Sequence, residues 1–245
     1  MARRLPDYGL DAPNVVRGFL LWGGLVALLG ALLLAGVLPL APALRRSAGS
    51  MLVWPGAIFF LEGLWMTWAS AVGKRHARDR LLDGVALRGD ERVLDVGCGR
   101  GLLLIGAAKR LTSGRAVGLD LWSQSDLGAN SKQAALANAR AEGVEGDVEV
   151  HDGDMRKMPF RDGEFDVVLA SLSIHNIPDR EGRRQAIREI ARVLKPGGHV
   201  ALQDFRATHE YALDLVAYGC EEVKESGPVF WIFPPVTVVT GKKRG

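Results

Sequence analysis

Three aspartates follow successive apolar runs of the sequence, and a cluster of glycines accompanies the first of them. Asp95 lies within the segment VLDVGCGRG, whose glycines allow a tight turn and let a ligand approach the backbone closely. Asp120 ends the second apolar run, 19 positions after Gly101, and Asp154 follows the third run. A carboxylate at the second position can bind both hydroxyls of a ribose, and one at the third can accept a hydrogen bond from an adenine amino group. The spacing therefore predicts a nucleoside-binding site.

The glycine segment indicates which nucleoside binds. A dinucleotide-binding turn has the pattern G-x-G-x-x-G, which would need a glycine at the position of Leu102. Asp95 would crowd a pyrophosphate, whereas its carboxylate complements the amino and sulfonium groups of S-adenosylmethionine. Each aspartate alone is more often a turn or cap residue. Together, at the carboxyl ends of three successive parallel strands, they favour an S-adenosylmethionine site.

These residues must be positioned by alternating short strands and helices, a pattern typical of a mostly parallel α/β sheet. The apolar runs predict strands at residues 92–96, 116–119, 148–151, 165–170 and 199–203. Helical periodicity predicts helices at residues 102–111, 131–142 and 180–194. A further helix near residues 209–218 leads to two more strands, near residues 222–225 and 236–240.

Residues 92–203 resemble the class I S-adenosylmethionine-dependent methyltransferases across nearly the whole core. The matching segments are VLDVGCGRG, GLD, GDM, FDVVLAS and EIARVLKPGGHVAL, in that order. The resemblance implies a Rossmann-like methyltransferase fold, a seven-stranded and mostly parallel sheet whose last strand, near residues 236–240, is antiparallel. It implies that the glycine segment approaches the methionine part of the cofactor, while Asp120 holds the ribose and Asp154 the adenine. The implied cofactor-binding residues are Asp95, Gly97, Cys98, Gly99, Asp120, Leu121, Trp122, Asp154, Met155 and Ser171.

The link that follows Asp120 departs from the commonest pattern of that family. Residues 121–130 make this link several residues longer than usual. Trp122 could cover the adenine, and the segment could act as a lid. A structured surface turn is the alternative, and the sequence leaves both open.

His175 is the candidate catalytic residue, because it follows the fourth expected strand, where a methyl acceptor would lie. Methyl transfer is an in-line displacement, and it needs a base only when the acceptor loses a proton during attack. An imidazole titrates near neutral pH and can take that proton. A loop histidine bonded to backbone, or a wall of the substrate pocket, stays open as the alternative. Weaker candidates for the acceptor site are Asn176, Gln203 and Asp204.

The first 73 residues contain two long apolar runs. Residues 18–38 carry no charge, and residues 47–73 are interrupted only by Glu62. Each run is long enough to cross the roughly 30 Å hydrocarbon core of a bilayer. We therefore expect a membrane anchor of two helices at residues 1–73 and a methyltransferase domain at residues 74–245. Two alternatives stay open: a secretory signal peptide ending near Ala41-Pro42-Ala43, and a hairpin that lies in the membrane interface.

Basic residues predict how this hairpin is oriented. The flanks of the two runs carry more lysine and arginine than the link between them, and such residues favour the cytoplasmic side. We expect a two-pass membrane protein with both ends and the catalytic domain in the cytoplasm. The flanking residues are Arg3, Arg4, Arg17, Lys74, Arg75, Arg78 and Arg80, and those of the link are Arg45 and Arg46.

The composition argues against other classes of function. The net charge of +3 is too small to indicate a nucleic-acid partner, and the cysteines and histidines lack the spacing of a metal site. The membrane anchor favours an apolar or amphiphilic acceptor, such as a lipid, a quinone or an isoprenoid-like molecule. A small soluble acceptor and an inactive cofactor-binding scaffold of a membrane complex both stay open.

Overall fold

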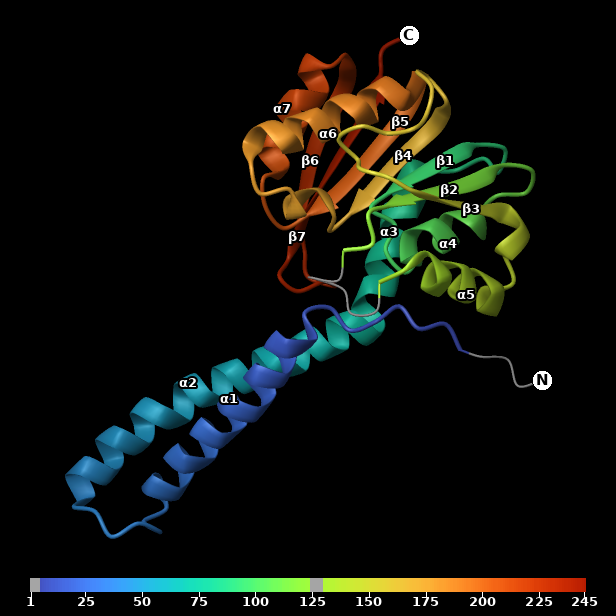
Figure 1. Ribbon diagram of the computed structural model, residues 1–245. Helices are drawn as coiled ribbons and strands as arrows, with labels where there is room; N and C mark the ends of the chain where they lie inside the picture. Colours follow the sequence, from blue (N-terminus) through green and yellow to red (C-terminus); the bar gives the residue numbers. More distant parts are fainter. Residues whose placement is uncertain (1–4, 124–129) are drawn as a thin grey trace. The chain divides into compact units, whose positions relative to one another are not determined.

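The computed structural model describes residues 5–123 and 130–245 (Figure 1), which form two compact units. The sheet unit contains Met1–Gly9, described from Leu5 onward, and Gly73–Gly245, while the hairpin unit is Leu10–Val72. The sequence grouped all of residues 1–73 as the anchor. The structure differs for the described residues before Leu10, because Tyr8 is buried in the core of the sheet unit.

The sheet unit is built on seven strands in the order β3-β2-β1-β4-β5-β7-β6. Strands β1 to β5 are parallel, and β7 runs antiparallel to both of its neighbours. The strand order reverses between β1 and β4, and open sheets of this kind bind ligands at the carboxyl edge beside such a point. The predicted sheet is thus confirmed. The strands are β1 Arg92–Val96, β2 Arg115–Asp120, β3 Val148–Asp152, β4 Phe165–Ser171, β5 Leu194–Asp204, β6 Cys220–Val229 and β7 Val236–Lys243.

Helices cover both faces of this sheet, so the central strands are buried on two sides (Figure 1). Helices α3, α4 and α5 contribute Leu81, Leu104 and Ala139 to one core, and α6 and α7 contribute Ile187 and Leu215 to the other. Burial on both faces explains why the strands read as continuous apolar runs. The helices are α3 Lys74–Val85, α4 Leu102–Ala108, α5 Lys132–Glu142, α6 Arg180–Val193 and α7 Thr208–Ala217.

The connection from β3 to β4 is a loop that packs on the sheet. Residues 153–164 are all described and form no helix. Met158 and Phe160 from this loop are buried in the same core as α6 and α7, and Met155 packs against that core. The loop therefore brings Asp154 and Met155 to the carboxyl edge of β3.

The hairpin unit consists of α1 (Pro13–Leu34) and α2 (Pro42–Trp68), which pack along rows of glycines. A methyl group placed on Gly23 would lie 2.6 Å from the amide nitrogen of Phe60 and 3.0 Å from the carbonyl oxygen of Gly56. The two backbones are therefore in direct contact, which side chains would prevent. The buried glycines recur every seven residues: Gly23 and Gly30 on α1, and Gly49, Gly56 and Gly63 on α2.

The outer surface of the hairpin unit is apolar. Large side chains such as Leu21, Trp22, Met51, Trp54 and Leu61 are exposed, and only 17% of the apolar window of each helix is buried. By length and composition, both helices could cross a membrane.

Two features near the hairpin differ from the sequence prediction, namely the start of α2 and the presence of α3. Helix α2 begins at Pro42, so Arg45 and Arg46 lie in its first turns and not in the link, because proline is favoured at the first helical position. Helix α3 was not predicted, since its charged residues obscure the buried face formed by Ala77, Leu81 and Leu82.

Candidate active site

The glycine loop, residues 97–101, connects β1 to α4 and folds over the end of β2. Gly97, Gly99 and Gly101 have φ angles of 73°, 53° and 83°, a region that other residues rarely adopt. The amides of Gly97 and Cys98 donate to the carbonyl of Leu119 at 2.7 and 3.1 Å. The loop is therefore fixed at the carboxyl edge of the sheet.

Asp95 is buried beside the glycine loop and is only 2% exposed. Its Oδ2 accepts a hydrogen bond from the amide of Leu104 at 2.8 Å, which satisfies a donor in the first turn of α4. Burial raises the pKa of Asp95 to about 7, and the charge of Asp120 contributes to the rise. A cation bound here would favour the ionised carboxylate, so the position fits the positively charged methionine part of S-adenosylmethionine.

Asp120 ends β2 and faces the glycine loop. Its Oδ2 accepts a hydrogen bond from the amide of Gly99 at 2.8 Å, and its Oδ1 accepts one from the amide of Trp122 at 2.6 Å. The side-chain amide of Asn130 also donates to Oδ1, at 3.3 Å. A carboxylate held at this strand end fits a contact with ribose hydroxyls.

Trp122 reaches from the end of β2 to the end of β3. Its indole Nε1 donates to Oδ1 of Asp152 at 2.6 Å, and its φ of 62° turns the chain sharply after Asp120. Leu121 beside it is exposed. The predicted lid spans residues 121–130, and residues 124–129 of it lie outside the described residues.

Asp154 is held by Arg156, whose guanidinium donates to both carboxylate oxygens at 2.6 to 3.0 Å. These hydrogen bonds lower the pKa of Asp154. The neighbouring Met155 reaches the glycine loop, since a methyl group on Gly97 would lie 3.5 Å from its Cε. The structure thus brings Met155 to the loop and pairs Asp154 with Arg156.

The end of β4 is tied to both neighbouring strands. Oγ of Ser171 accepts a hydrogen bond from Nε2 of Gln203 at the end of β5, at 2.9 Å. Oγ of Ser173 donates to the carbonyl of Val96 in β1 at 2.8 Å. Ser173 also packs against Gly97, a contact that the sequence analysis missed because it depends on how β1 and β4 are aligned.

His175 lies in the short turn Ile174–Asn176 after β4 and meets Asp204 at the end of β5. Its Nδ1 is 2.8 Å from Oδ1 of Asp204, an ion-pair distance, although Nδ1 has no partner of hydrogen-bond geometry among the described residues. The amide of His175 donates to Oδ2 of the same carboxylate at 3.1 Å. Nε2 lies on the opposite side of the ring from this contact.

Asp204 is 2% exposed and gathers further donors. The amide of Phe205 donates to its Oδ1 at 2.9 Å, and the hydroxyl of Tyr211 donates to its Oδ2 at 3.4 Å. Burial raises the pKa of Tyr211, and the charge of Asp204 adds to this effect. From the sequence, Asp204 is only a weaker acceptor-site candidate, because no spacing along the chain connects it to His175.

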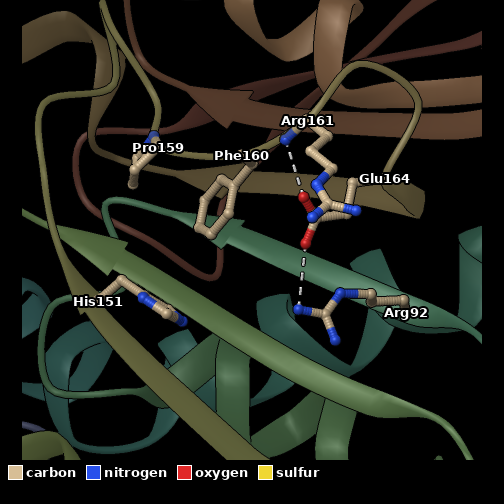
Figure 2. Close-up of a pocket in the computed structure, with 6 residues that line it drawn as sticks. All are labelled: Arg92, His151, Pro159, Phe160, Arg161 and Glu164. Atoms are coloured by element: carbon tan, nitrogen blue, oxygen red, sulfur yellow. Dashed lines mark hydrogen bonds and ion pairs between the residues drawn. The ribbon is translucent and has the colours of Figure 1, made fainter.

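A hollow of about 400 Å³ lies elsewhere on the sheet unit (Figure 2). Arg92 on its wall is the first residue of β1, at the opposite end of that strand from the glycine loop. Glu164 accepts a hydrogen bond from the amide of Arg161 at 2.8 Å and pairs with Arg92 at 3.2 Å, as Figure 2 shows. Arg92 and Glu164 thus pair with one another on the wall of the hollow. Its lining residues are Arg92, His151, Pro159, Phe160, Arg161 and Glu164.

Comparison with known proteins identifies the domain that contains this site. Residues 94–202, from β1 to β5, match a family model described as a methyltransferase domain. These residues form a methyltransferase domain. The match includes the glycine loop and His175, and it confirms the resemblance to S-adenosylmethionine-dependent methyltransferases at the level of this domain.

Relatives of the methyltransferase domain include enzymes with large organic substrates in their names. The 27-O-demethylrifamycin SV methyltransferase of Amycolatopsis mediterranei is 38% identical over 148 residues, which cover 59% of this chain and 50% of the relative. The demethylmenaquinone methyltransferase of Lactobacillus johnsonii is 31% identical over 128 residues, covering 51% of this chain and 48% of the relative. The chain thus spans about half the length of these curated relatives.

Solved structures share the fold of the methyltransferase domain. One is a SAM-dependent methyltransferase from Aquifex aeolicus, with a TM-score of 0.54 and 20% identity, covering 67% of this chain and 88% of that chain.

Among the described residues, no group of His, Cys, Asp and Glu could hold a metal ion.

Proposed function

We propose that this chain is an S-adenosylmethionine-dependent methyltransferase anchored in a membrane, and that its acceptor is an apolar or amphiphilic molecule held in the bilayer. The hairpin unit carries this proposal, because glycines lie between its helices and large apolar side chains face outward. Transmembrane helices pack in this way, since small residues let their backbones approach closely. In water, the same surface would be an unusually large exposed apolar patch.

The names of the relatives support an acceptor of this class. One relative is named for a demethylated rifamycin and another for demethylmenaquinone. A quinone, an isoprenoid-like molecule or a lipid is the corresponding candidate here. Each is apolar enough to be concentrated in the bilayer that would hold the anchor.

S-adenosylmethionine supplies an activated methyl group when it is bound. We propose that Asp95 and the glycine loop hold its methionine part, that Asp120 binds the ribose hydroxyls, and that Asp154 and Met155 contact the adenine. Asp154 would exchange one of its hydrogen bonds with Arg156 for the adenine amino group. The remaining proposed lining residues are Cys98, Leu121, Trp122 and Ser171.

We propose that His175 is the general base for an acceptor hydroxyl. The hydroxyl oxygen would form a bond to the methyl carbon as the bond from that carbon to sulfur breaks, which leaves S-adenosylhomocysteine. The hydroxyl proton would pass to Nε2 of His175 and then to solvent. The buried carboxylate of Asp204, 2.8 Å from Nδ1, stabilises the imidazolium that forms. The name of the rifamycin relative, which specifies an oxygen, agrees with this chemistry.

Labelled cofactor tests the proposed function. The purified full-length chain is incubated with methyl-labelled S-adenosylmethionine and vesicles of total membrane extract, and the products are separated by solvent extraction. We expect label in the organic-soluble fraction, and none when Asp120→Ala replaces the wild type. Label confined to the aqueous fraction would indicate a soluble acceptor, and cofactor binding without transfer would indicate an inactive scaffold.

We also propose that both ends of the hairpin and the methyltransferase domain lie in the cytoplasm. The flanking basic residues support this orientation. Lys74 is an exception, because its side chain is buried and cannot face a lipid surface. Cysteine probes at positions 46 and 90 test the orientation in intact cells. We expect an impermeant reagent to label position 46 alone, and labelling of position 90 alone would overturn the proposal.

A further inference from the structure

The segment before the hairpin is held against the methyltransferase domain by side chains. Residues 7–9, which we call the N-terminal strap, contain Tyr8, which is 5% exposed and lies in the core formed with α3, α4 and α5. The hydroxyl of Tyr8 donates to Glu142 of α5 at 3.1 Å. The ammonium of Lys74 donates to the carbonyls of Tyr8 and Gly9 at 3.0 and 2.6 Å. The strap therefore belongs to the sheet unit, and the hairpin unit is joined to the sheet unit at both of its ends.

Asn138 connects this strap to the glycine loop. Its side-chain oxygen accepts a hydrogen bond from the amide of Asp7 at 2.9 Å, and its side-chain nitrogen donates to the carbonyl of Asp7 at 2.8 Å. The same nitrogen donates to the carbonyl of Arg100 in the glycine loop at 2.9 Å. Asn138 is only 5% exposed, so these bonds are shielded from water.

A second connection joins the strap to the loop through charge. The guanidinium of Arg100 lies 2.7 Å from Oδ2 of Asp7. Oδ1 of Asp7 accepts a hydrogen bond from the amide of Gly9. This bond is the main reason that the pKa of Asp7 is lowered, and the charge of Arg100 lowers it further. Both the carbonyl and the side chain of Arg100 are therefore fixed by the strap and by Asn138.

We infer that the N-terminal strap and Asn138 position the glycine loop, and thereby set the affinity of the methyltransferase domain for S-adenosylmethionine. Across residues 99–101, Gly99 donates a hydrogen bond to Asp120, and Gly101 bonds to Cys98 and Ile105, but these bonds do not hold Arg100. The glycines on either side of Arg100 leave this part of the loop many conformations without such contacts. Holding Arg100 at both its carbonyl and its guanidinium restricts the loop to the conformation that is seen. Asn138 is a positioning residue, since it acts on the cofactor through the loop.

The inference rests on the proposed assignment of the glycine loop to the cofactor, and Asn138→Asp in the full-length chain tests it. This variant keeps the size of the side chain and removes the nitrogen that donates to Asp7 and Arg100. We expect its dissociation constant for S-adenosylhomocysteine, measured by calorimetry, to rise about tenfold. Hydrogen exchange should become faster at the amides of residues 97–104 and at those of the strap, because the loop loses its anchor.

Two further variants make the result decisive. Arg140→Gln removes an exposed ion pair with Glu145 on the same helix as Asn138, so its affinity should match that of the wild type. Asp7→Ala should weaken binding in the same direction as Asn138→Asp. Faster exchange of the strap in Asn138→Asp, with unchanged affinity and unchanged exchange at residues 97–104, would overturn the inference. Asp120→Ala separates this result from the assignment of the site: unchanged affinity there would contradict the cofactor site itself.

Discussion

Asp95 is a buried acid whose charge depends on what binds beside it. Its pKa of about 7 lies above the ordinary 3.8, so the folded protein holds a proton that the unfolded chain has lost. The resulting stabilisation is complete below about pH 3.8 and is lost as the pH rises to about 7. A cation beside Asp95 favours the ionised form, so binding of S-adenosylmethionine should release a proton. We expect the affinity to increase between about pH 6 and pH 8.

Calorimetry in two buffers of different ionisation enthalpy measures this proton release. Asp95→Asn is the matched control, because its side-chain oxygen can still accept the hydrogen bond from the amide of Leu104. The variant should bind with an affinity that varies little over the same range of pH. Wild type and variant with the same pH dependence would show that Asp95 does not face the charged part of the cofactor.

His175 and Asp204 should act as a pair in the chemical step. As a general base, His175 contributes a factor of about 10² to 10⁴, so His175→Ala should lower kcat by about that much and leave cofactor affinity unchanged. Added imidazole should restore part of the rate, which a purely structural histidine would not allow. Asp204→Asn should also lower kcat, because the imidazolium loses its stabilising charge.

Rates are measured with membrane extract as the source of acceptor. Glu181→Gln, at an exposed position in the first turn of α6, is the control and should keep the wild-type rate. A kcat for His175→Ala within about twofold of wild type would contradict the proposed base.

The residues of the site differ in how far the sequence could predict them. The glycine loop and Asp120 are local features, because a strand, a turn and a terminal acid follow one another along the chain. The contact of His175 with Asp204 joins two strand ends 29 positions apart, and it depends on the parallel pairing of Ser171 with Gln203. No spacing in the sequence encodes that alignment.

At the scale of elements, β1 to β4 and α5 to α7 begin and end within one residue of their predicted bounds, whereas β5 and β6 are longer than predicted. β1 has the predicted bounds, since a strand buried on both faces is a sharply limited apolar run. α3 was missed because only one narrow face of it is buried, and that face is hidden among charged residues. The strap was missed because its three residues have no periodicity and are held by side chains of α3 and α5.

The glycine rows of the hairpin unit should determine whether its two helices pack. A side chain on Gly56 would overlap the backbone of Ala27 and approach the carbonyl of Gly23 to 2.9 Å, and backbone cannot move aside as a side chain can. We expect Gly56→Leu to destabilise the hairpin by at least about 2 kcal/mol. Cysteines replacing Phe19 and Phe59, whose rings lie 5.3 Å apart, report the packing by their rate of cross-linking.

Gly18→Leu is the matched control for Gly56→Leu. It adds the same side chain to α1, but a methyl group at Gly18 meets no atom within 4 Å. Its cross-linking rate should equal that of the parent protein, while that of Gly56→Leu should fall. Equal rates in both variants would contradict the close glycine packing.

At the scale of the whole molecule, the two units share one chain in an unusual order. The hairpin unit is inserted between the strap and α3, so the sheet unit is built from two separate segments of the chain. The sequence predicted two long apolar helices followed by a mostly parallel sheet, and the structure contains both. It could not reveal that residues 7–9 belong with the methyltransferase domain, because that assignment depends on the burial of Tyr8 and on contacts with distant side chains.

The central claim is that the acceptor lies in the bilayer that holds the hairpin. The most direct measurement compares how fast the acceptor is methylated in two populations of vesicles. Full-length protein is reconstituted into vesicles of membrane extract and mixed with protein-free vesicles of the same extract that carry a biotinylated lipid. After methyl-labelled S-adenosylmethionine is added, streptavidin separates the two populations. A tethered enzyme sees a far higher local concentration of acceptor in its own membrane, so label should appear first in the vesicles that contain protein. Equal initial rates of labelling in both populations would contradict the claim.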